Sequence, residues 1–161
     1  AAFVERVLPA IKRAAAGIGV DPQALLAQAA LETGWGQRIP KNADGSSSFN
    51  LFGIKAGAQW RGARAPATTV EFDGLVARRR QATFRSYASI EDSVKDFAQL
   101  VSQSPRYGEA LSRGADARAF VQSLAAAGYA TDPQYVHKIN QILQSDRLRA
   151  AFPPRTAALQ K

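Results

Sequence analysis

The sequence predicts an α+β fold in which a mostly helical lobe and a small β-hairpin lobe flank a substrate cleft. Apolar residues recur at helical spacing over most of the chain, and several of these segments begin with helix-cap residues. One stretch near the middle instead alternates, is rich in β-branched residues and contains the turn pair Asp73-Gly74. Before it, residues 39–67 lack periodicity, and loops of this kind often line a cleft.

The size of the chain fits a single domain. Its 161 residues, 46% of them hydrophobic, are enough for one sizeable core. We expect this domain to cover residues 1–152 and a flexible tail to cover 153–161. The sequence has no methionine, even at position 1, so we expect a processed product or an excised fragment. No segment has the pattern of a signal peptide or a membrane span.

The rare residue types exclude several chemistries. The chain has no cysteine, which excludes disulfides and thiol catalysis. The single histidine, His137, argues against a histidine-rich zinc site, and no serine lies in a nucleophile-elbow motif. His137 falls on a predicted helix, where we expect a surface or half-buried position. We therefore expect neither a metal ion nor a cofactor.

The charge of the chain predicts an anionic partner. A formal charge of +8 and a pI near 10.3 attract polyanions. Nucleic acid, an anionic membrane surface and the carboxylate-rich peptides of a bacterial wall all satisfy this requirement. No nucleic-acid-binding motif accompanies the basic residues, so we expect neither a nucleic acid partner nor membrane insertion.

Two helices are predicted before the loop. Apolar residues at helical spacing indicate the first over residues 2–17, closed by Gly17 or Gly19. Asp21 and Pro22 then form an N-cap and a first helical residue, and Gly34 supplies the stop of the second helix.

Glu32 falls in the last turn of this second helix, where a carboxylate is electrostatically unfavourable. The negative end of the helix dipole and an apolar wall built from Leu25, Leu31 and Trp35 both favour its protonated form. A carboxylic acid that stays protonated near neutral pH can donate its proton to a leaving group. The alternative is a solvated glutamate at a frayed helix end.

The alternating segment predicts a β-hairpin with strands at 67–72 and 75–87. Glu71 lies two residues before the turn, on the face opposite Val70 and Phe72. This position suits a second functional carboxylate. The alternative is a cross-strand ion pair with one of the arginines of the returning strand.

Helices are predicted again after the hairpin. Ser89 begins a capping-box-like sequence for a helix to about Gln103, and SerProArgTyr at 104–107 interrupts the pattern. The remaining predicted helices cover about 107–113, Asp116 to Ala127, and Pro133 to about Arg149.

Together these features describe a lysozyme-like division into a helical lobe and a small β lobe. Two carboxylates that face a cleft are the usual equipment for glycoside hydrolysis. The loop and one strand between Glu32 and Glu71 supply enough chain to bring the two residues across from each other.

Four ordered motifs also resemble a known family. They are AlaGlnAlaAlaLeuGluThrGlyTrpGly (27–36), AsnLeuPheGlyIleLys (50–55), SerProArgTyr (104–107) and GlyTyrAlaThrAspProGlnTyr (128–135). They resemble the C-terminal hydrolase domains of FlgJ-type flagellar proteins, peptidoglycan β-N-acetylglucosaminidases of glycoside hydrolase family seventy-three. The resemblance runs from about residue 3 to residue 149. It implies a lysozyme-like fold and cleavage of wall glycan after N-acetylglucosamine.

The resemblance also implies roles for individual residues. It makes Glu32 the general acid and Glu71 the second acid, with Asp73 as a rival. It places Tyr129 where its phenol positions the acetamido group of the substrate or a water.

Four further residues are candidates for substrate binding because of their side chains. The amide of Asn50 can donate to and accept from a sugar, and Phe52 and Trp60 can stack on sugar rings. Tyr107 is a similar candidate. For Phe52, packing in the core is the favoured alternative.

The family further implies partners and a place of action. The glycan of peptidoglycan is the expected substrate, and flagellar rod proteins are expected partners through an N-terminal domain that this chain lacks. The expected site of action is the periplasm, where the hydrolase would let the rod cross the wall. Two other readings stay open, a lytic transglycosylase or muramidase of lysozyme-like fold, and a non-catalytic wall-binding module.

Overall fold

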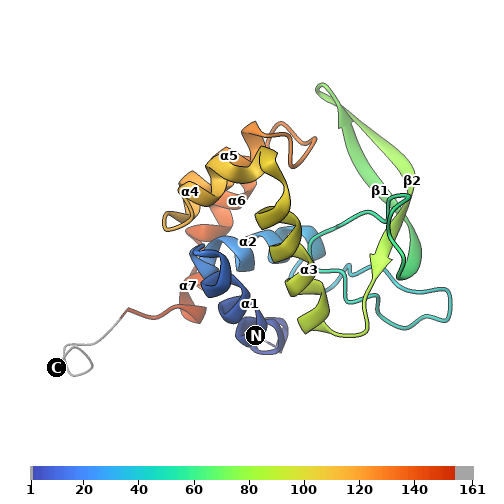
Figure 1. The fold of residues 1–161 in the computed structure, drawn as a ribbon, viewed down its shortest axis with the longest axis horizontal. Coiled ribbons are helices and arrows are strands. Elements are labelled where there is room, and N and C mark those ends of the chain that lie inside the picture. The colour runs from blue at the N-terminus through green and yellow to red at the C-terminus, as the bar shows by residue number, and fades with distance from the viewer. Residues whose placement is uncertain (1, 155–161) are drawn as a thin grey trace.

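The computed structural model describes residues 2–154, which form a helical lobe with a two-stranded lobe beside it (Figure 1). The strands are β1 (Ala63–Asp73) and β2 (Val76–Ser86). The helices are α1 (Ala2–Ile18), α2 (Pro22–Thr33), α3 (Ile90–Gln103), α4 (Gly108–Ser112), α5 (Ala117–Ala126), α6 (Tyr135–Leu143) and α7 (Asp146–Ala151), with a 3-10 turn at Pro105–Tyr107. The predicted α+β architecture is confirmed. Residues 155–161 of the predicted flexible tail lie outside the described residues.

Helix α2 lies at the centre of the helical lobe, where it contacts α1, α5, α6 and α7. Leu25 and Leu26 are fully buried, and the alanines beside them allow neighbouring helices to approach closely. The core around α2 includes Val7, Ile11, Phe97, Phe120, Leu124, Ile139 and Leu148. A functional side chain at the end of α2 is therefore supported by a helix that is buried among four others.

The ends of α2 are those that the sequence predicts. Asp21 accepts a hydrogen bond from the backbone N–H of Gln23 at 2.9 Å, and Pro22 occupies the first helical position. Gly34 adopts the left-handed conformation with φ of 57° and donates its backbone N–H to the carbonyl of Ala30. These local signals fix where the helix stops, two residues after Glu32.

The hairpin is longer than predicted, and its turn is shifted. β1 begins at Ala63 instead of residue 67, and the strands pair antiparallel from Ala63 opposite Ser86 to Asp73 opposite Val76. The turn residues are Gly74 and Leu75, not Asp73 and Gly74. Gly74 has φ of +64° at the first turn position, as a type II′ turn requires.

The early start of β1 has a cause outside the strand. The guanidinium of Arg64 donates to the carbonyls of Ala56, Gly57 and Trp60, which anchors the strand to the preceding loop. The same loop joins the sheet edge through a hydrogen bond from Ala56 N–H to the carbonyl of Thr83 at 2.8 Å. The loop and the root of the hairpin thus form one unit.

The prediction of a single last helix is wrong. Instead of running from Pro133 to about Arg149, the chain forms α6 and then α7, separated at Gln144 and Ser145. Ser145 starts α7 because its hydroxyl accepts a hydrogen bond from the backbone N–H of Leu148. Asp132 and Pro133 form a turn before α6, and His137 is exposed on α6 as predicted.

The outer end of the hairpin reaches back to the helical lobe. Figure 1 shows its tip near the connection between α5 and α6. The backbone N–H of Phe72 donates to the hydroxyl of Thr131 at 3.1 Å, and the ammonium of Lys138 lies 5.9 Å from the ring centre of Phe72. The two lobes therefore contact each other at the hairpin root and again near its tip.

Candidate active site

Glu32 lies where the end of α2 meets the loop before the hairpin. Gly53 of that loop packs against its carboxyl so closely that a Cβ at position 53 would clash with Oε1 of Glu32. Gly53 also has φ of +64°, a conformation that side chains rarely adopt. Position 53 of the AsnLeuPheGlyIleLys motif therefore needs a glycine for two reasons. The carboxyl of Glu32 leaves no room for a side chain, and the positive φ favours glycine.

The carboxyl of Glu32 is reached by solvent, yet protein surrounds it on most sides. The side chain of Glu32 is exposed to solvent. Even so, burial raises the pKa of Glu32 above its ordinary value, and the charges of Arg38 and Lys55 oppose this rise. The predicted upward direction of the pKa is confirmed.

Tyr129 belongs to a cluster of three tyrosines beside Glu32. Its ring centre lies 6.0 Å from that of Tyr107 and 6.0 Å from that of Tyr135. Burial, followed by the proximity of Tyr135 and Glu32, raises the pKa of Tyr129 far above the ordinary value. The phenol of Tyr129 therefore stays neutral and can donate its proton in a hydrogen bond. The charge of Glu32 is thus close enough to act on the phenol of Tyr129.

Gln28 supports this cluster from within the core. It lies one helical turn before Glu32 on the same face of α2. Its side-chain amide is buried and donates to the hydroxyl of Tyr135 at 3.0 Å. Its Oε1 has no hydrogen-bond partner among the described residues. Gln28 was not predicted as a site residue, although its spacing of four residues from Glu32 was a signal for it.

Glu71 is connected to Glu32 through Lys55. The ammonium of Lys55 forms an ion pair with Glu71, and the same charge lowers the pKa of Glu32. The predicted alternative, an ion pair with an arginine of β2, is wrong. Arg78, directly opposite Glu71, instead contacts Asp73 at 3.8 Å. No role in the site was predicted for Lys55, although Lys55 ends one of the four motifs.

Asp73 differs from Glu71 in its surroundings. Its side chain is 72% exposed next to the turn, whereas that of Glu71 is 24% exposed. The described contacts of Asp73 connect it to Arg78 and not to Lys55 or Glu32. Of the two rivals, Glu71 is the one that shares a cation with Glu32.

Asn50 was predicted to bind substrate, but its side chain instead forms hydrogen bonds that hold the loop together. It is fully buried, and its amide nitrogen donates to the carbonyls of Ile54 and Arg85 at 2.8 and 2.9 Å. Its Oδ1 accepts from the backbone N–H of Ile54. The two bonds with Ile54 close the loop on itself, and the bond to the carbonyl of Arg85 ties it to β2, so these bonds occupy the buried amide.

The three aromatic candidates also have structural partners. Phe52 is buried and stacks on Phe97 with ring centres 4.1 Å apart, so the alternative of core packing is the correct one. Tyr107 is buried behind Tyr129. Trp60 is partly buried at the hairpin root, where the guanidinium of Arg85 lies 4.6 Å from the centre of its ring. None of the three has a described contact with Glu32.

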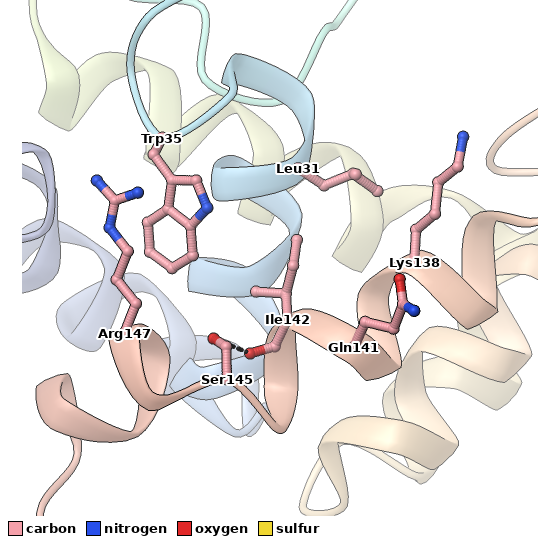
Figure 2. Close-up of a pocket in the computed structure, with 7 residues that line it drawn as sticks. All are labelled: Leu31, Trp35, Lys138, Gln141, Ile142, Ser145 and Arg147. Carbon is pink, nitrogen blue, oxygen red and sulfur yellow. Dashed lines mark hydrogen bonds between the residues drawn. The ribbon is translucent and has the colours of Figure 1, made fainter.

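A shallow pocket of about 320 Å³ adjoins the end of α2. Figure 2 shows Leu31 and Trp35 on one side and side chains of α6 on the other, with Arg147 beside the indole. Leu31 and Trp35 belong to the wall predicted around Glu32, but Glu32 itself does not line the pocket. The third member, Leu25, lies in the core.

The described residues contain no group of three or more His, Cys, Asp or Glu side chains able to hold a metal ion. No helix within residues 2–154 is long and apolar enough to cross a bilayer.

The family model and the known proteins that match this chain all point to the same family. The model of a family described as mannosyl-glycoprotein endo-beta-N-acetylglucosaminidase, or Glucosaminidase, matches residues 8–148. Peptidoglycan hydrolase FlgJ of Pseudomonas aeruginosa is 50% identical over 140 residues, which are 87% of this chain and 35% of the relative. FlgJ of Vibrio parahaemolyticus is 44% identical over 88% of this chain and 46% of the relative. This chain thus spans less than half the length of these relatives.

Solved structures agree with the sequence comparisons. A mutant of the peptidoglycan hydrolase from Sphingomonas sp. A1 superposes with a TM-score of 0.88 and 43% identity, covering 93% of this chain and 96% of that one. Because the family model extends over most of the described fold, including Glu32, Glu71 and Tyr129, the chain belongs to the glucosaminidase family of glycoside hydrolases.

Proposed function

We propose that this domain hydrolyses the β-N-acetylglucosaminyl bonds of bacterial peptidoglycan, with Glu32 as the general acid. The observation that carries the proposal is the carboxyl of Glu32, which solvent reaches although its surroundings raise its pKa. A group with these two properties can meet a substrate and holds its proton to a higher pH than an ordinary glutamate. The names of the FlgJ relatives, which are peptidoglycan hydrolases, support wall glycan as the substrate.

In the proposed reaction, Glu32 gives its proton to the glycosidic oxygen as the bond from that oxygen to C1 breaks. The oxygen of a water forms the new bond to C1. The positive charge that develops at C1 favours a nearby carboxylate, which is the expected contribution of Glu71. The neutral phenol of Tyr129 donates a hydrogen bond to the acetamido group of the substrate or to the water.

The role of Glu71 separates two routes. If Glu71 takes a proton from the attacking water, the anomeric centre is inverted. If the acetamido carbonyl of the substrate bonds to C1 first, a water displaces it in a second step and gives its proton to the Glu32 carboxylate. Configuration is then retained, and Glu71 or Tyr129 only assists. The ion pair with Lys55 supports Glu71 over Asp73 in either role, because it holds the carboxylate in a fixed place near Glu32.

The test is a digestion of purified peptidoglycan followed by borohydride reduction and mass spectrometry of the new ends. Reduced N-acetylglucosamine supports the proposal. Reduced muramic acid would assign a muramidase, and an anhydro-muramic end would assign a lytic transglycosylase. Binding to the wall without new ends would leave a non-catalytic module. The Glu32→Gln variant is the control for contaminating hydrolases.

We further propose that the parent protein acts in the periplasm and opens the wall for a flagellar rod. The resemblance to FlgJ proteins supports this role, and rod proteins are the proposed partners of the part of the parent outside this chain. The test replaces the hydrolase domain of a FlgJ protein with this chain in a motile bacterium. Swimming should be restored by the chain and not by its Glu32→Gln variant.

A further inference from the structure

The pocket beside the end of α2 has an apolar floor and a basic rim. Leu31, Trp35 and Ile142 are each partly exposed, which leaves an apolar surface open between α2 and α6. Lys138 and Arg147 stand at its edge, and Gln141 adds an amide (Figure 2). No carboxylate lines the pocket. An occupant must therefore combine small apolar groups with negative charge.

The two cations of the rim are held differently. Lys138 is paired with Asp132 and reaches over the ring of Phe72. Arg147 lies 4.2 Å from the ring centre of Trp35 and takes part in none of the ion pairs of the described residues. A guanidinium that stacks on an indole keeps its N–H edge directed outward, where it can bind a carboxylate through two hydrogen bonds. Arg147 is thus the residue most open to an anionic ligand.

The position of the pocket relates it to the proposed catalytic acid. Leu31 directly precedes Glu32, so the pocket and the carboxyl share the last turn of α2. On the far side, Lys138 contacts Phe72, one residue beyond Glu71 in β1. The pocket therefore adjoins the region where Glu32 and Glu71 would act on a glycan.

We propose that this pocket binds the peptide stem of peptidoglycan, a proposal that rests on the proposed function. The stem branches from the muramic acid next to the cleaved N-acetylglucosamine, and it consists of alanyl residues and residues with free carboxylates. Alanyl methyl groups match the floor formed by Leu31, Trp35 and Ile142. A stem carboxylate matches the guanidinium of Arg147. The pocket thereby selects glycan that still carries its peptides.

The activity test uses two matched substrates, glycan strands with their stems and the same strands stripped by an amidase. The chain should cleave the stem-bearing strands with a kcat/KM about tenfold higher, the size expected for one charge-assisted pair of hydrogen bonds. Arg147→Glu should reduce this ratio to about one, because like charges repel. Arg149→Glu is the control, since Arg149 is exposed on the same helix and does not line the pocket. It should keep the ratio of the unmodified chain.

Two outcomes would overturn the proposal. One is equal cleavage of both substrates by the unmodified chain, which is expected if the pocket holds a sugar ring. The other is an Arg147→Glu variant that folds, as judged by circular dichroism, and keeps the preference. If neither substrate is cleaved, the proposed hydrolase function fails instead.

A binding measurement tests the pocket without catalysis. The probe is a soluble N-acetylglucosaminyl-muramyl tetrapeptide, compared with the same disaccharide lacking the peptide. Trp35 and Trp60 are the two tryptophans of the chain, so its nuclear magnetic resonance spectrum contains two indole N–H signals to follow. The tetrapeptide should shift the signal of Trp35, and the plain disaccharide should shift it less. Equal shifts, or no shift with the tetrapeptide, would contradict a stem site.

Discussion

The two lobes hold their carboxylates in different ways. Glu32 ends a helix that is packed on four neighbouring helices, and burial by the surrounding protein is the largest influence on its pKa. Glu71 lies in the outer half of a two-stranded hairpin, and a single ion pair with Lys55 holds it. Burial in the helical lobe thus raises the pKa of Glu32, whereas the ion pair in the hairpin lobe only positions Glu71.

The hairpin itself is anchored at its two ends. Of its strand residues, Ala65, Phe84 and Ser86 near the root are buried, while Val70 and Val76 near the turn are exposed. Arg85 at the root forms an ion pair with Asp96 of α3 at 2.8 Å. The tip has the hydrogen bond from Phe72 to Thr131. A lobe with so little buried surface tolerates substitution better than the end of α2.

The largest effect should follow from Glu32→Gln. The amide has nearly the same shape but no proton to give to a leaving group, so kcat should fall about a thousandfold, within the range of general acid catalysis. The measurement is the release of reducing ends from peptidoglycan, together with a thermal melt. An unchanged rate in a folded variant would remove Glu32 from the mechanism and would reverse the ranking of the two lobes.

The next effect should come from Gly53→Ala. The added methyl group must enter the space of the Glu32 carboxyl, and the residue must keep φ of +64°, so the acid is displaced. Misplacement of a catalytic group by about 1 Å can lower kcat about a hundredfold. Gly57→Ala is the matched control, because Gly57 has no neighbouring atom within 4 Å of an added Cβ. Equal activities for the two variants would show that Gly53 is not needed for the position of Glu32.

The sequence predicted the helical part of the site better than the loop and the hairpin. Asp21, Pro22 and Gly34 act on their own neighbours, so local signals were enough to place Glu32 in the last turn of α2. Asn50 was mistaken for a binding residue because one of its partners, the carbonyl of Arg85, lies 35 positions away in the chain. Lys55 and Glu71 were likewise not paired in advance, since only the folded loop brings them together.

Two boundaries were predicted wrongly, the turn of the hairpin and the end of α6. Asp73-Gly74 is a typical turn pair, but the register of the sheet makes Gly74 and Leu75 the turn. The pattern of apolar residues continues through 133–149, and the chain nevertheless turns at Ser145, which caps α7. In the hairpin the pairing of the two strands decided the boundary, whereas at Ser145 a local cap started a new helix.

A smaller effect should follow from Glu71→Gln. The amide loses the ion pair with Lys55 and cannot take a proton, but Glu32 and the tyrosine cluster stay intact, so kcat should fall about tenfold. Asp73→Asn is the matched control on the same strand, because Asp73 is more exposed and contacts Arg78. Its activity should equal that of the unmodified chain. A larger loss for Asp73→Asn than for Glu71→Gln would make Asp73 the second acid.

The smallest effect should be a shift of the pH profile in Arg38→Gln and Lys55→Met. Both cations lower the pKa of Glu32, so removal of either one raises this pKa and keeps the acid protonated to higher pH. The alkaline limb of kcat/KM should therefore move upward in both variants, and further for Arg38→Gln, since Arg38 has the stronger influence. A downward shift would mean that another group controls this limb.

The variants Arg38→Gln and Lys55→Met also distinguish effects on Glu32 from effects on Glu71. Arg38 has no ion pair with Glu71, whereas Lys55 does, so only Lys55→Met should also lower the maximal kcat. Combined with Glu71→Gln, Lys55→Met should lower kcat no further, because the ion pair is already lost, although its effect on the alkaline limb should remain. If the two substitutions instead multiplied their effects on kcat, Lys55 would act on Glu32 or on the substrate directly, and Glu71 would not depend on it for its position.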